Sequence, residues 1–158
     1  MTQSLTYADS IVIDASPAEV YALVSDVART GEWSPICREC WWDEGEGPAV
    51  GSFFTGRNVT PERTWETRCE VVAAEPGAEF GWSVNGGAVF WRYAMKAAGS
   101  GTELTESWEF TEAGQELFKT RFGDAAAAQI AAREKAAHEG IPATLAAMKR
   151  LVEATPAG

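Results

Sequence analysis

The sequence predicts an α+β domain in which a curved antiparallel sheet wraps around a long C-terminal helix. Three observations predict this fold class. Strand-like segments separated by turn signals follow one another through most of the chain, so neighbouring strands can pair as hairpins. The segment 124–154 is rich in Ala, Glu, Lys and Arg, which favour helix. A chain of 158 residues without an internal repeat is long enough for one domain with a sizeable core.

The first part of the chain predicts one strand and two short helices. Residues 6–14 are β-branched near their end and predict the first strand. Ser16 then has the position of a helix N-cap, with Pro17 as the first helical residue and Glu19 three residues after the cap, as in a capping box. A second short helix is expected at 27–30.

Six further strands are expected after these helices. Their predicted ranges are 37–44, 51–60, 64–75, 79–84, 88–97 and 102–111. Turn signals separate several of them, among them Pro-Gly at 76–77 and Asn-Gly-Gly at 85–87. The full predicted order is therefore β-α-α-β6-α, and the long helix is expected to pack on the concave side of the sheet.

The C-terminal segment predicts a long amphipathic helix. Its buried face is defined by residues at three- and four-residue spacings. The members of that face are Ile130, Glu134, Ala137, Ile141, Leu145, Met148 and Val152. Pro142 removes a backbone hydrogen bond and is expected to bend the helix near Glu139. Residues after about 155 are expected to form a frayed tail.

One strand face carries a charge where a packed core would not. In the strand at 102–111, one face is formed by alternate residues, namely Leu104, Glu106, Trp108 and Phe110. Three large apolar side chains mark that face as interior, and a carboxylate in a packed core is strongly disfavoured without a partner. We therefore expect Glu106 to line a hollow, partly hydrated interior that binds a molecule.

Composition and charge exclude several classes of protein. The net charge of −10 and the pI near 4.6 argue against nucleic acid or an anionic membrane surface as the main partner. No stretch approaches the roughly 18 apolar residues of a transmembrane helix, so stable membrane insertion is not expected. Residues 1–8 lack the features of a secretory signal, which predicts a cytoplasmic protein. The three cysteines are then expected to be reduced thiols.

The order of elements and several motifs resemble the START-like superfamily, also called SRPBCC or polyketide cyclase/dehydrase-like, and its small actinobacterial members most closely. The stretches that carry the resemblance are IVIDASPAEVYALVSD at 11–26, EWSP at 32–35, 51–58, 65–76 and TESW at 105–108. The resemblance implies a helix-grip fold, in which residues 1–158 form a single START-like ligand-binding domain with a cavity between sheet and helix. Its members include lipid carriers, plant hormone and alkaloid binders, aromatase/cyclases and co-chaperone-like proteins, so the fold alone does not fix the function.

Aromatic side chains and one helix residue are expected to form the cavity wall. Trp65, Tyr93 and Trp108 share strand faces with polar residues, and Ile141 adds apolar contact from the helix. The segment 115–123 is a longer approach to the last helix than the resemblance implies. It is expected to be either a lid over the cavity mouth or an extra turn of helix.

Glu106 has two interpretations. It orients the polar end of a ligand or acts as a general base, and burial would raise its pKa toward the useful range. Alternatively, it forms a structural ion pair with Arg92, Arg133 or another basic group, since structural networks also perturb carboxylates. Tyr93 and His138 are the other candidates for moving protons in a catalytic cavity.

Asn58 and His138 also have two interpretations each. By the resemblance, Phe54, Gly56 and Asn58 face the interior. Asn58 then hydrogen-bonds a ligand or pairs with Glu106; otherwise it satisfies a bulge at a strand end. His138 is the only histidine, and it either shuttles protons opposite Glu106 or is a boundary residue that caps the helix near its predicted bend.

Cys37 and Cys40 have CxxC spacing, but neither a metal site nor a redox site is expected. Zinc would need two more ligands, and only Cys69 and His138 remain, on other elements. Residues three apart in a strand also face opposite sides, which prevents both thiols from reaching one ion. No cofactor is expected, because the chain has no phosphate loop, no nucleophile elbow and no Rossmann fingerprint.

Three classes of function follow. The first is binding of a small hydrophobic, aromatic or lipid-like molecule by a monomer or homodimer, with Asn58 and Glu106 fixing its polar end. The second is an aromatase/cyclase-type enzyme that acts on a polyketide-like substrate by the acid/base chemistry of its side chains. The third is a co-chaperone-like protein-interaction module, which predicts a small or filled cavity and an exposed apolar patch.

Overall fold

The computed structural model describes residues 3–45 and 47–154, and the predicted frayed tail lies outside these residues. Its seven strands form one antiparallel sheet with the order β1-β7-β6-β5-β4-β3-β2. The strands are β1 (Leu5–Ile13), β2 (Cys37–Trp42), β3 (Phe53–Thr60), β4 (Arg63–Glu75), β5 (Glu79–Val84), β6 (Val89–Ala98) and β7 (Gly101–Phe110). From β2 to β7 each strand pairs with the next along the chain, as hairpin connections predict.

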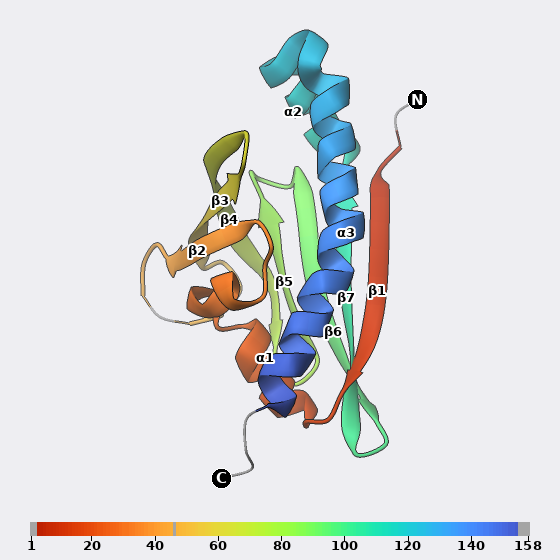
Figure 1. The fold of residues 1–158 in the computed structure, drawn as a ribbon. Coiled ribbons are helices and arrows are strands. Elements are labelled where there is room, and N and C mark those ends of the chain that lie inside the picture. Colours follow the sequence, from red (N-terminus) through yellow and green to blue (C-terminus); the bar gives the residue numbers. More distant parts are fainter. Residues whose placement is uncertain (1–2, 46, 155–158) are drawn as a thin grey trace.

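Three α-helices and two short 3₁₀ helices complete the described chain. They are α1 (Pro17–Val24), η1 (Val27–Glu32), α2 (Glu112–Phe122), η2 (Gly123–Ala125) and α3 (Ala126–Glu153). Figure 1 shows α3 running along the sheet, with β1 on one side of it and the β2, β3 and β4 strands on the other. Helix α3 packs against β1 and β7, and α2 packs against α3. The α+β class and the helix-grip arrangement are confirmed.

Local signals in the sequence account for the N-terminal helices. The Ser16 hydroxyl accepts a hydrogen bond from the Glu19 backbone N–H at 3.2 Å, and Pro17 is the first residue of α1, as predicted. The second helix is 3₁₀ rather than α and continues through Gly31 to Glu32, two residues beyond its predicted end.

The C-terminal helix is confirmed as α3, which continues through Pro142 as one element. The bend predicted near Glu139 stays a prediction. The segment 115–123 is helical and forms most of α2, so the interpretation as extra helix is confirmed.

Helix α2 is fixed to the end of the sheet by a close backbone approach. The Thr111 hydroxyl caps the helix by accepting a hydrogen bond from the Gly114 N–H at 3.0 Å. A Cβ at Gly114 would lie 2.2 Å from the carbonyl oxygen of Ala88, so only glycine fits there. The position of α2 is therefore set by backbone contact with the segment that leads into β6.

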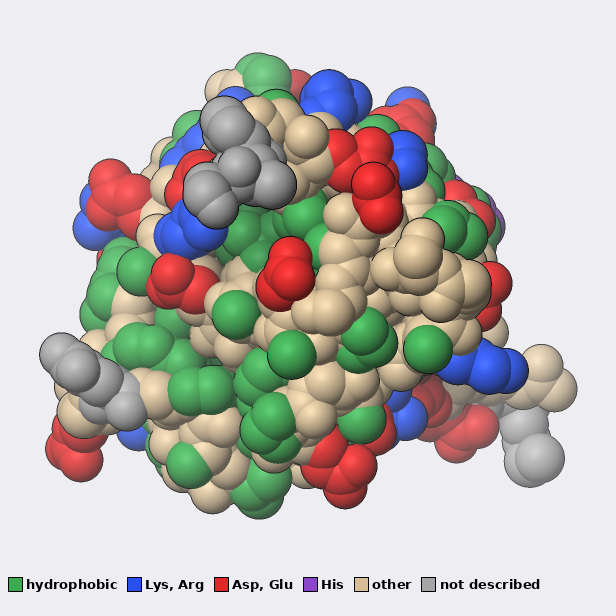
Figure 2. Space-filling model, turned by 90° about the horizontal axis from the view of Figure 1, so that it is seen from below, with side chains coloured by type: hydrophobic (Ala, Val, Ile, Leu, Met, Phe, Trp, Pro, Cys, Tyr) green, Lys and Arg blue, Asp and Glu red, His purple; other side chains and the backbone are tan. Residues whose placement is uncertain are grey.

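The surface carries the negative charge in a dispersed form. Figure 2, which views the molecule from below, shows acidic side chains scattered over that face rather than gathered into one patch. None of the α-helices within residues 3–45 and 47–154 combines the length and the apolar character needed to cross a membrane.

Candidate ligand-binding site

A cavity of about 280 Å³ lies between the sheet and helices α2 and α3. Its strand side is mostly aromatic and comprises Phe54, Trp65, Phe80, Trp82, Trp91, Tyr93 and Trp108. Its helix side comprises Phe118, Arg121, Phe122, Arg133, Ala136, Ala137, Gly140 and Thr144. An apolar cavity with a few polar groups is typical of a small-molecule site. The hollow interior predicted from Glu106 is therefore present, and Trp65, Tyr93 and Trp108 all lie on its wall.

Glu106 is the buried polar centre of this cavity. Its side chain is 4% exposed, and its Oε1 atom accepts no hydrogen bond from the described residues. Burial raises its pKa from the ordinary value of 4.5 to about 8, while the Tyr93 hydroxyl, which hydrogen-bonds to the carboxyl group, acts in the opposite direction. The carboxyl group is therefore mostly protonated at neutral pH and can both donate and accept a hydrogen bond.

The ion pair considered for Glu106 is not formed. Arg92 pairs instead with Glu79 on the exposed face of the sheet. Arg133 lies over the Trp65 ring, with 4.6 Å between its Cζ and the ring centroid. Among the described residues, none of the ion pairs includes Glu106.

Tyr93 links Glu106 to a residue that the sequence did not single out as functional. Tyr93 on β6 stands directly opposite Glu106 on β7. Burial, followed by the charge of Glu106, raises the pKa of Tyr93 well above 10, whereas a hydrogen bond from the Trp33 side chain lowers it. Trp33, which follows η1, is buried and lines the cavity. Its indole N–H, the Tyr93 hydroxyl and the Glu106 carboxyl therefore form a connected polar row in an otherwise apolar wall.

Asn58 lies on the cavity wall with Phe54 and Gly56, on the interior face that the resemblance implies. Its Nδ2 donates to the Thr67 hydroxyl at 3.2 Å and to the Trp65 carbonyl oxygen at 3.4 Å. These bonds join β3 to β4, so the predicted pairing of Asn58 with Glu106 is not formed. The Asn58 side chain remains a polar group on the wall.

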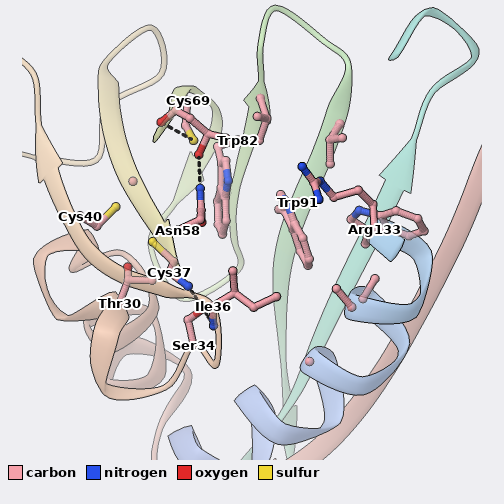
Figure 3. Close-up of a pocket in the computed structure, with 18 of the residues that line it drawn as sticks. Thr30, Ser34, Ile36, Cys37, Cys40, Asn58, Cys69, Trp82, Trp91 and Arg133 are labelled. Atoms are coloured by element: carbon pink, nitrogen blue, oxygen red, sulfur yellow. Dashed lines mark hydrogen bonds between the residues drawn. The ribbon is translucent and has the colours of Figure 1, made fainter. Parts of the chain in front are cut away.

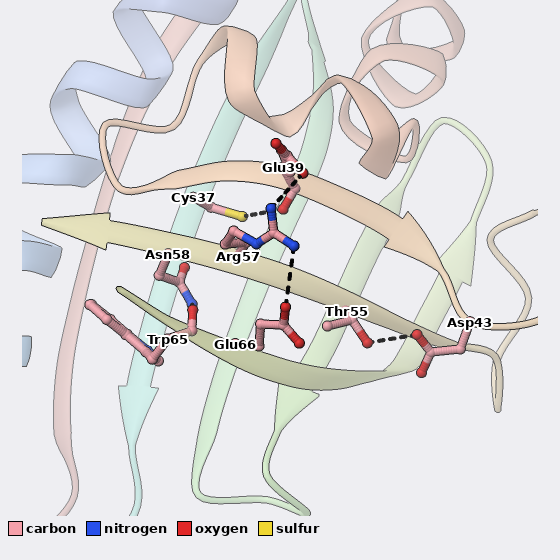
Figure 4. Close-up of polar contacts among 8 residues, drawn as sticks. All are labelled: Cys37, Glu39, Asp43, Thr55, Arg57, Asn58, Trp65 and Glu66. Carbon is pink, nitrogen blue, oxygen red and sulfur yellow. Dashed lines mark hydrogen bonds and ion pairs between the residues drawn. The ribbon is translucent and has the colours of Figure 1, made fainter. Parts of the chain in front are cut away.

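The exposed face of β2, β3 and β4 is held together separately. The Arg57 guanidinium lies between Glu39, at 3.2 Å, and Glu66, at 3.5 Å. The Thr55 hydroxyl donates to Asp43 at 2.6 Å. Figure 4 shows these contacts running across the three strands. These contacts connect β2, β3 and β4 on the side of the sheet where Arg57 and Glu39 are exposed.

Two predicted site residues lie away from the cavity. His138 is exposed and stacks on Tyr7 of β1, with 4.1 Å between the ring centroids. It therefore does not face Glu106, and the proton-shuttle interpretation is wrong. Ile141 is 1% exposed and belongs to the packed core, whereas its neighbours Gly140 and Thr144 line the cavity. Ile141 points into the core because successive helix residues project in different directions.

The cysteines are closer together than the sequence predicted. A β-bulge between Cys37 and Glu39 interrupts the alternation of β2, so the expectation that Cys37 and Cys40 face opposite sides is wrong. Both sulfur atoms lie near Gly56, because a Cβ built there would be 3.0 Å from Cys37 Sγ and 3.8 Å from Cys40 Sγ. Cys37, Cys40 and Cys69 all line the cavity. Figure 3 shows Cys37 and Cys40 across the cavity from Trp91 and Arg133.

The three thiols differ in acidity. The pKa of Cys37 is lowered, mainly because the Cys40 thiol hydrogen-bonds to it. The same bond and burial raise the pKa of Cys40, and burial raises that of Cys69 to about 12. Within residues 3–45 and 47–154, no cluster of three or more His, Cys, Asp or Glu side chains is arranged to hold a metal ion.

The end of the cavity next to α2 is basic and aromatic. Arg63 on β4 and Arg133 on α3 both lie over the Trp65 ring, with Cζ-to-centroid distances of 5.3 Å and 4.6 Å. Phe122 lies against Arg63 at 5.4 Å, and Phe118 against Arg133 at 5.5 Å. Residues of the segment 115–123 thus line this end of the cavity, and the lid interpretation stays a prediction. The sequence held a signal for this group, since Arg63 and Trp65 are two apart and share a strand face.

Comparisons with known proteins agree with this fold. The sequence profile described as polyketide cyclase / dehydrase and lipid transport matches residues 4–153. The solution structure of the Polyketide_cyc-like protein Cgl2372 from Corynebacterium glutamicum is 60% identical, covers 97% of this chain and 94% of its own, and superposes with a TM-score of 0.71. A search of curated proteins finds no match.

More distant structures share the fold alone. The di-domain ARO/CYC StfQ from the steffimycin biosynthetic pathway is 14% identical with a TM-score of 0.73, over 96% of this chain and 51% of that one. The major latex-like protein 151 of Panax ginseng is 14% identical with a TM-score of 0.59, over 70% of this chain and 80% of that one.

Proposed function

The chain belongs to the polyketide cyclase/dehydrase and lipid-transport family, and we propose that it is a single ligand-binding domain that holds a small aromatic or lipid-like molecule in the cavity beside α3. The observation that carries this proposal is Glu106, whose unpartnered Oε1 lies in a mostly aromatic cavity. Leaving a buried polar atom without a hydrogen bond costs about 1–3 kcal/mol. A ligand oxygen at this position would offset that cost.

The protonation state of Glu106 defines the ligand group that it recognises. With a pKa of about 8, the carboxyl group carries its proton at neutral pH and can donate it to a carbonyl or hydroxyl oxygen. Trp65 and Trp108 supply apolar contact area for the body of the molecule. The ligand is therefore an apolar or aromatic molecule that carries at least one uncharged oxygen.

A matched pair of compounds tests this function. Titrations that follow tryptophan fluorescence compare 2-acetylnaphthalene with 2-ethylnaphthalene, which has the same shape without the oxygen. Substitution of Glu106→Leu is expected to weaken binding of the ketone by about tenfold and to leave the hydrocarbon unaffected. Equal binding of both compounds by the wild-type protein would contradict the role of Glu106. Native mass spectrometry of the purified protein identifies a molecule that co-purifies with it.

A second function, of the aromatase/cyclase type, is favoured by the contact between Tyr93 and Glu106. In its ionised form, a carboxyl group with a pKa of about 8 is a stronger base than an ordinary carboxylate. It can take up a proton from a carbon between two carbonyl groups, while the Tyr93 hydroxyl donates a hydrogen bond to the carbonyl oxygen as its charge develops. A poly-β-ketone thioester tests it. Catalysis predicts that Glu106→Gln abolishes turnover while binding is kept, and binding alone predicts no turnover by either protein. A protein-interaction module predicts a small or filled cavity and an exposed apolar patch, and this third function stays a prediction.

A further inference from the structure

The basic end of the cavity carries a second recognition element. Arg63 and Arg133 approach the same Trp65 ring from two different elements, β4 and α3. We propose that these two guanidinium groups bind the anionic group of an amphipathic ligand whose apolar body occupies the cavity. This inference rests on the proposed binding function and narrows the ligand class to an organic anion, such as a carboxylate or sulfonate on an aromatic or aliphatic body.

Neither arginine has a carboxylate partner among the described residues. The arginines in ion pairs are Arg29, Arg57, Arg68 and Arg92. The carboxylate that lines the cavity nearby, Glu66, pairs with Arg57 at 3.5 Å. Both guanidinium groups lie over an aromatic ring, and contacts of this kind leave their N–H groups able to form paired hydrogen bonds with an anion.

The charge at this end of the cavity also favours an anion. Arg133 is half-buried, and both burial and the charge of Arg63 lower its pKa. Two like charges at one end of an apolar cavity repel each other, as the lowered pKa of Arg133 indicates. An anion close to both groups would stabilise both. This is a local feature, because the chain as a whole carries a net charge of −10.

The two ends of the cavity offer complementary polar groups. Glu106 offers a protonated carboxyl group in the interior, whereas the end covered by Phe118 and Phe122 of α2 offers positive charge. A molecule with a neutral oxygen in the interior and a charged group beside α2 would satisfy both. An uncharged lipid would satisfy only the first.

Two fluorescent probes that differ in charge test the proposal. 8-Anilinonaphthalene-1-sulfonate and N-phenyl-1-naphthylamine share one aromatic body, but only the first carries a sulfonate. Substitution of Arg133→Gln is expected to weaken binding of the sulfonate by about tenfold and to change binding of the neutral amine less than twofold. Arg63→Gln, at an exposed position at the start of β4, is the second variant in case Arg133→Gln unfolds the protein. Arg150→Gln, on the exposed side of the same helix, is the matched control and should change neither affinity.

The outcomes separate this proposal from the proposed function. Two results together support the anion site. Both variants lose affinity for the sulfonate but keep their affinity for the neutral amine, and added salt weakens sulfonate binding by the wild-type protein. An equal loss for both probes shows that the arginines act only as apolar wall and overturns the proposal while cavity binding stands. If neither probe binds the wild-type protein, the cavity-binding function fails and this inference fails with it.

Discussion

The two opposite walls of the cavity place ionisable groups in similar apolar surroundings with opposite results. On the wall formed by β6 and β7, burial raises the pKa of Glu106 to about 8. On the wall formed by β2 and β3, the pKa of Cys37 is lowered although burial acts against this. The difference lies in the hydrogen-bond donors. Cys37 accepts from the Cys40 thiol and from the Arg57 backbone N–H, whereas Glu106 Oε1 accepts from no described residue.

At Glu106 burial therefore outweighs the hydrogen bond from Tyr93, whereas at Cys37 the hydrogen bond from the Cys40 thiol outweighs burial. A ligand would meet a protonated acid on one wall and the most acidic of three thiols on the other. Four experiments test this contrast.

The largest effect is expected from Glu106→Gln, measured as the pH dependence of unfolding. The pKa of Glu106 is about 8 in the folded protein and near 4.5 in the unfolded chain, so the unfolded chain loses this proton first. The contribution of Glu106 to wild-type stability should therefore be full below about pH 4.5, be lost as the pH rises to 8, and stay constant above it. Glu106→Gln does not titrate and so does not show this loss. The free energy of unfolding of the variant, relative to that of the wild type, should therefore increase by about 3–5 kcal/mol between pH 4.5 and pH 8.

Urea unfolding at several pH values between 4.5 and 9 measures this gain. Glu109→Gln is the control, because Glu109 lies on the opposite face of the same strand, β7. A constant difference between wild type and Glu106→Gln across this pH range would show that Glu106 is ionised in the folded protein.

The next largest effect is expected from Gly56→Ala on the thiol wall. The new Cβ would lie 3.0 Å from Cys37 Sγ, which is too close without a local shift, and we expect a loss of about 1–2 kcal/mol in the free energy of unfolding. The double variant with Cys37→Ala removes the sulfur and should recover most of that loss, which a double-mutant cycle measures. Additive losses in the cycle would contradict the close packing of Cys37 on Gly56.

The same two walls show where sequence reasoning succeeds. Strand β7 pairs without a register shift with both β1 and β6, so its alternation predicted correctly that Leu104, Glu106 and Trp108 face inward. Strand β2 contains a bulge at Cys37, which no residue type in this segment predicts. The rule that strand side chains alternate between the two faces therefore placed the thiols wrongly.

The cavity contents were harder to predict than the sheet. Whether Glu106 is ionised or neutral depends on which groups surround it in three dimensions. From the sequence alone, Arg92 and Arg133 were both possible ion-pair partners. In the structure, Arg92 lies on the exposed face of the sheet and pairs with Glu79, and Arg133 lies over the Trp65 ring. Tertiary contacts of this kind connect residues far apart in the chain, and local periodicity does not report them.

A smaller effect is expected in thiol reactivity. Because the pKa of Cys37 is lowered and those of Cys40 and Cys69 are raised, iodoacetamide at neutral pH should modify Cys37 several-fold faster than the other two, as peptide mass spectrometry reports. Cys40→Ser keeps a hydroxyl donor and should preserve most of this reactivity, whereas Cys40→Ala should reduce it. Equal modification of all three thiols would remove the contrast between the walls.

The smallest effect is expected from His138→Ala. His138 is exposed and stacks on Tyr7 outside the cavity, so its loss should cost less than about 1 kcal/mol of stability and leave the binding of both naphthalene compounds unchanged. His138→Phe keeps the stacking and should restore the lost stability. If His138→Ala changes the pH dependence of ligand binding, His138 exchanges protons with Glu106. Loss of the stacking contact with Tyr7 would not change that pH dependence.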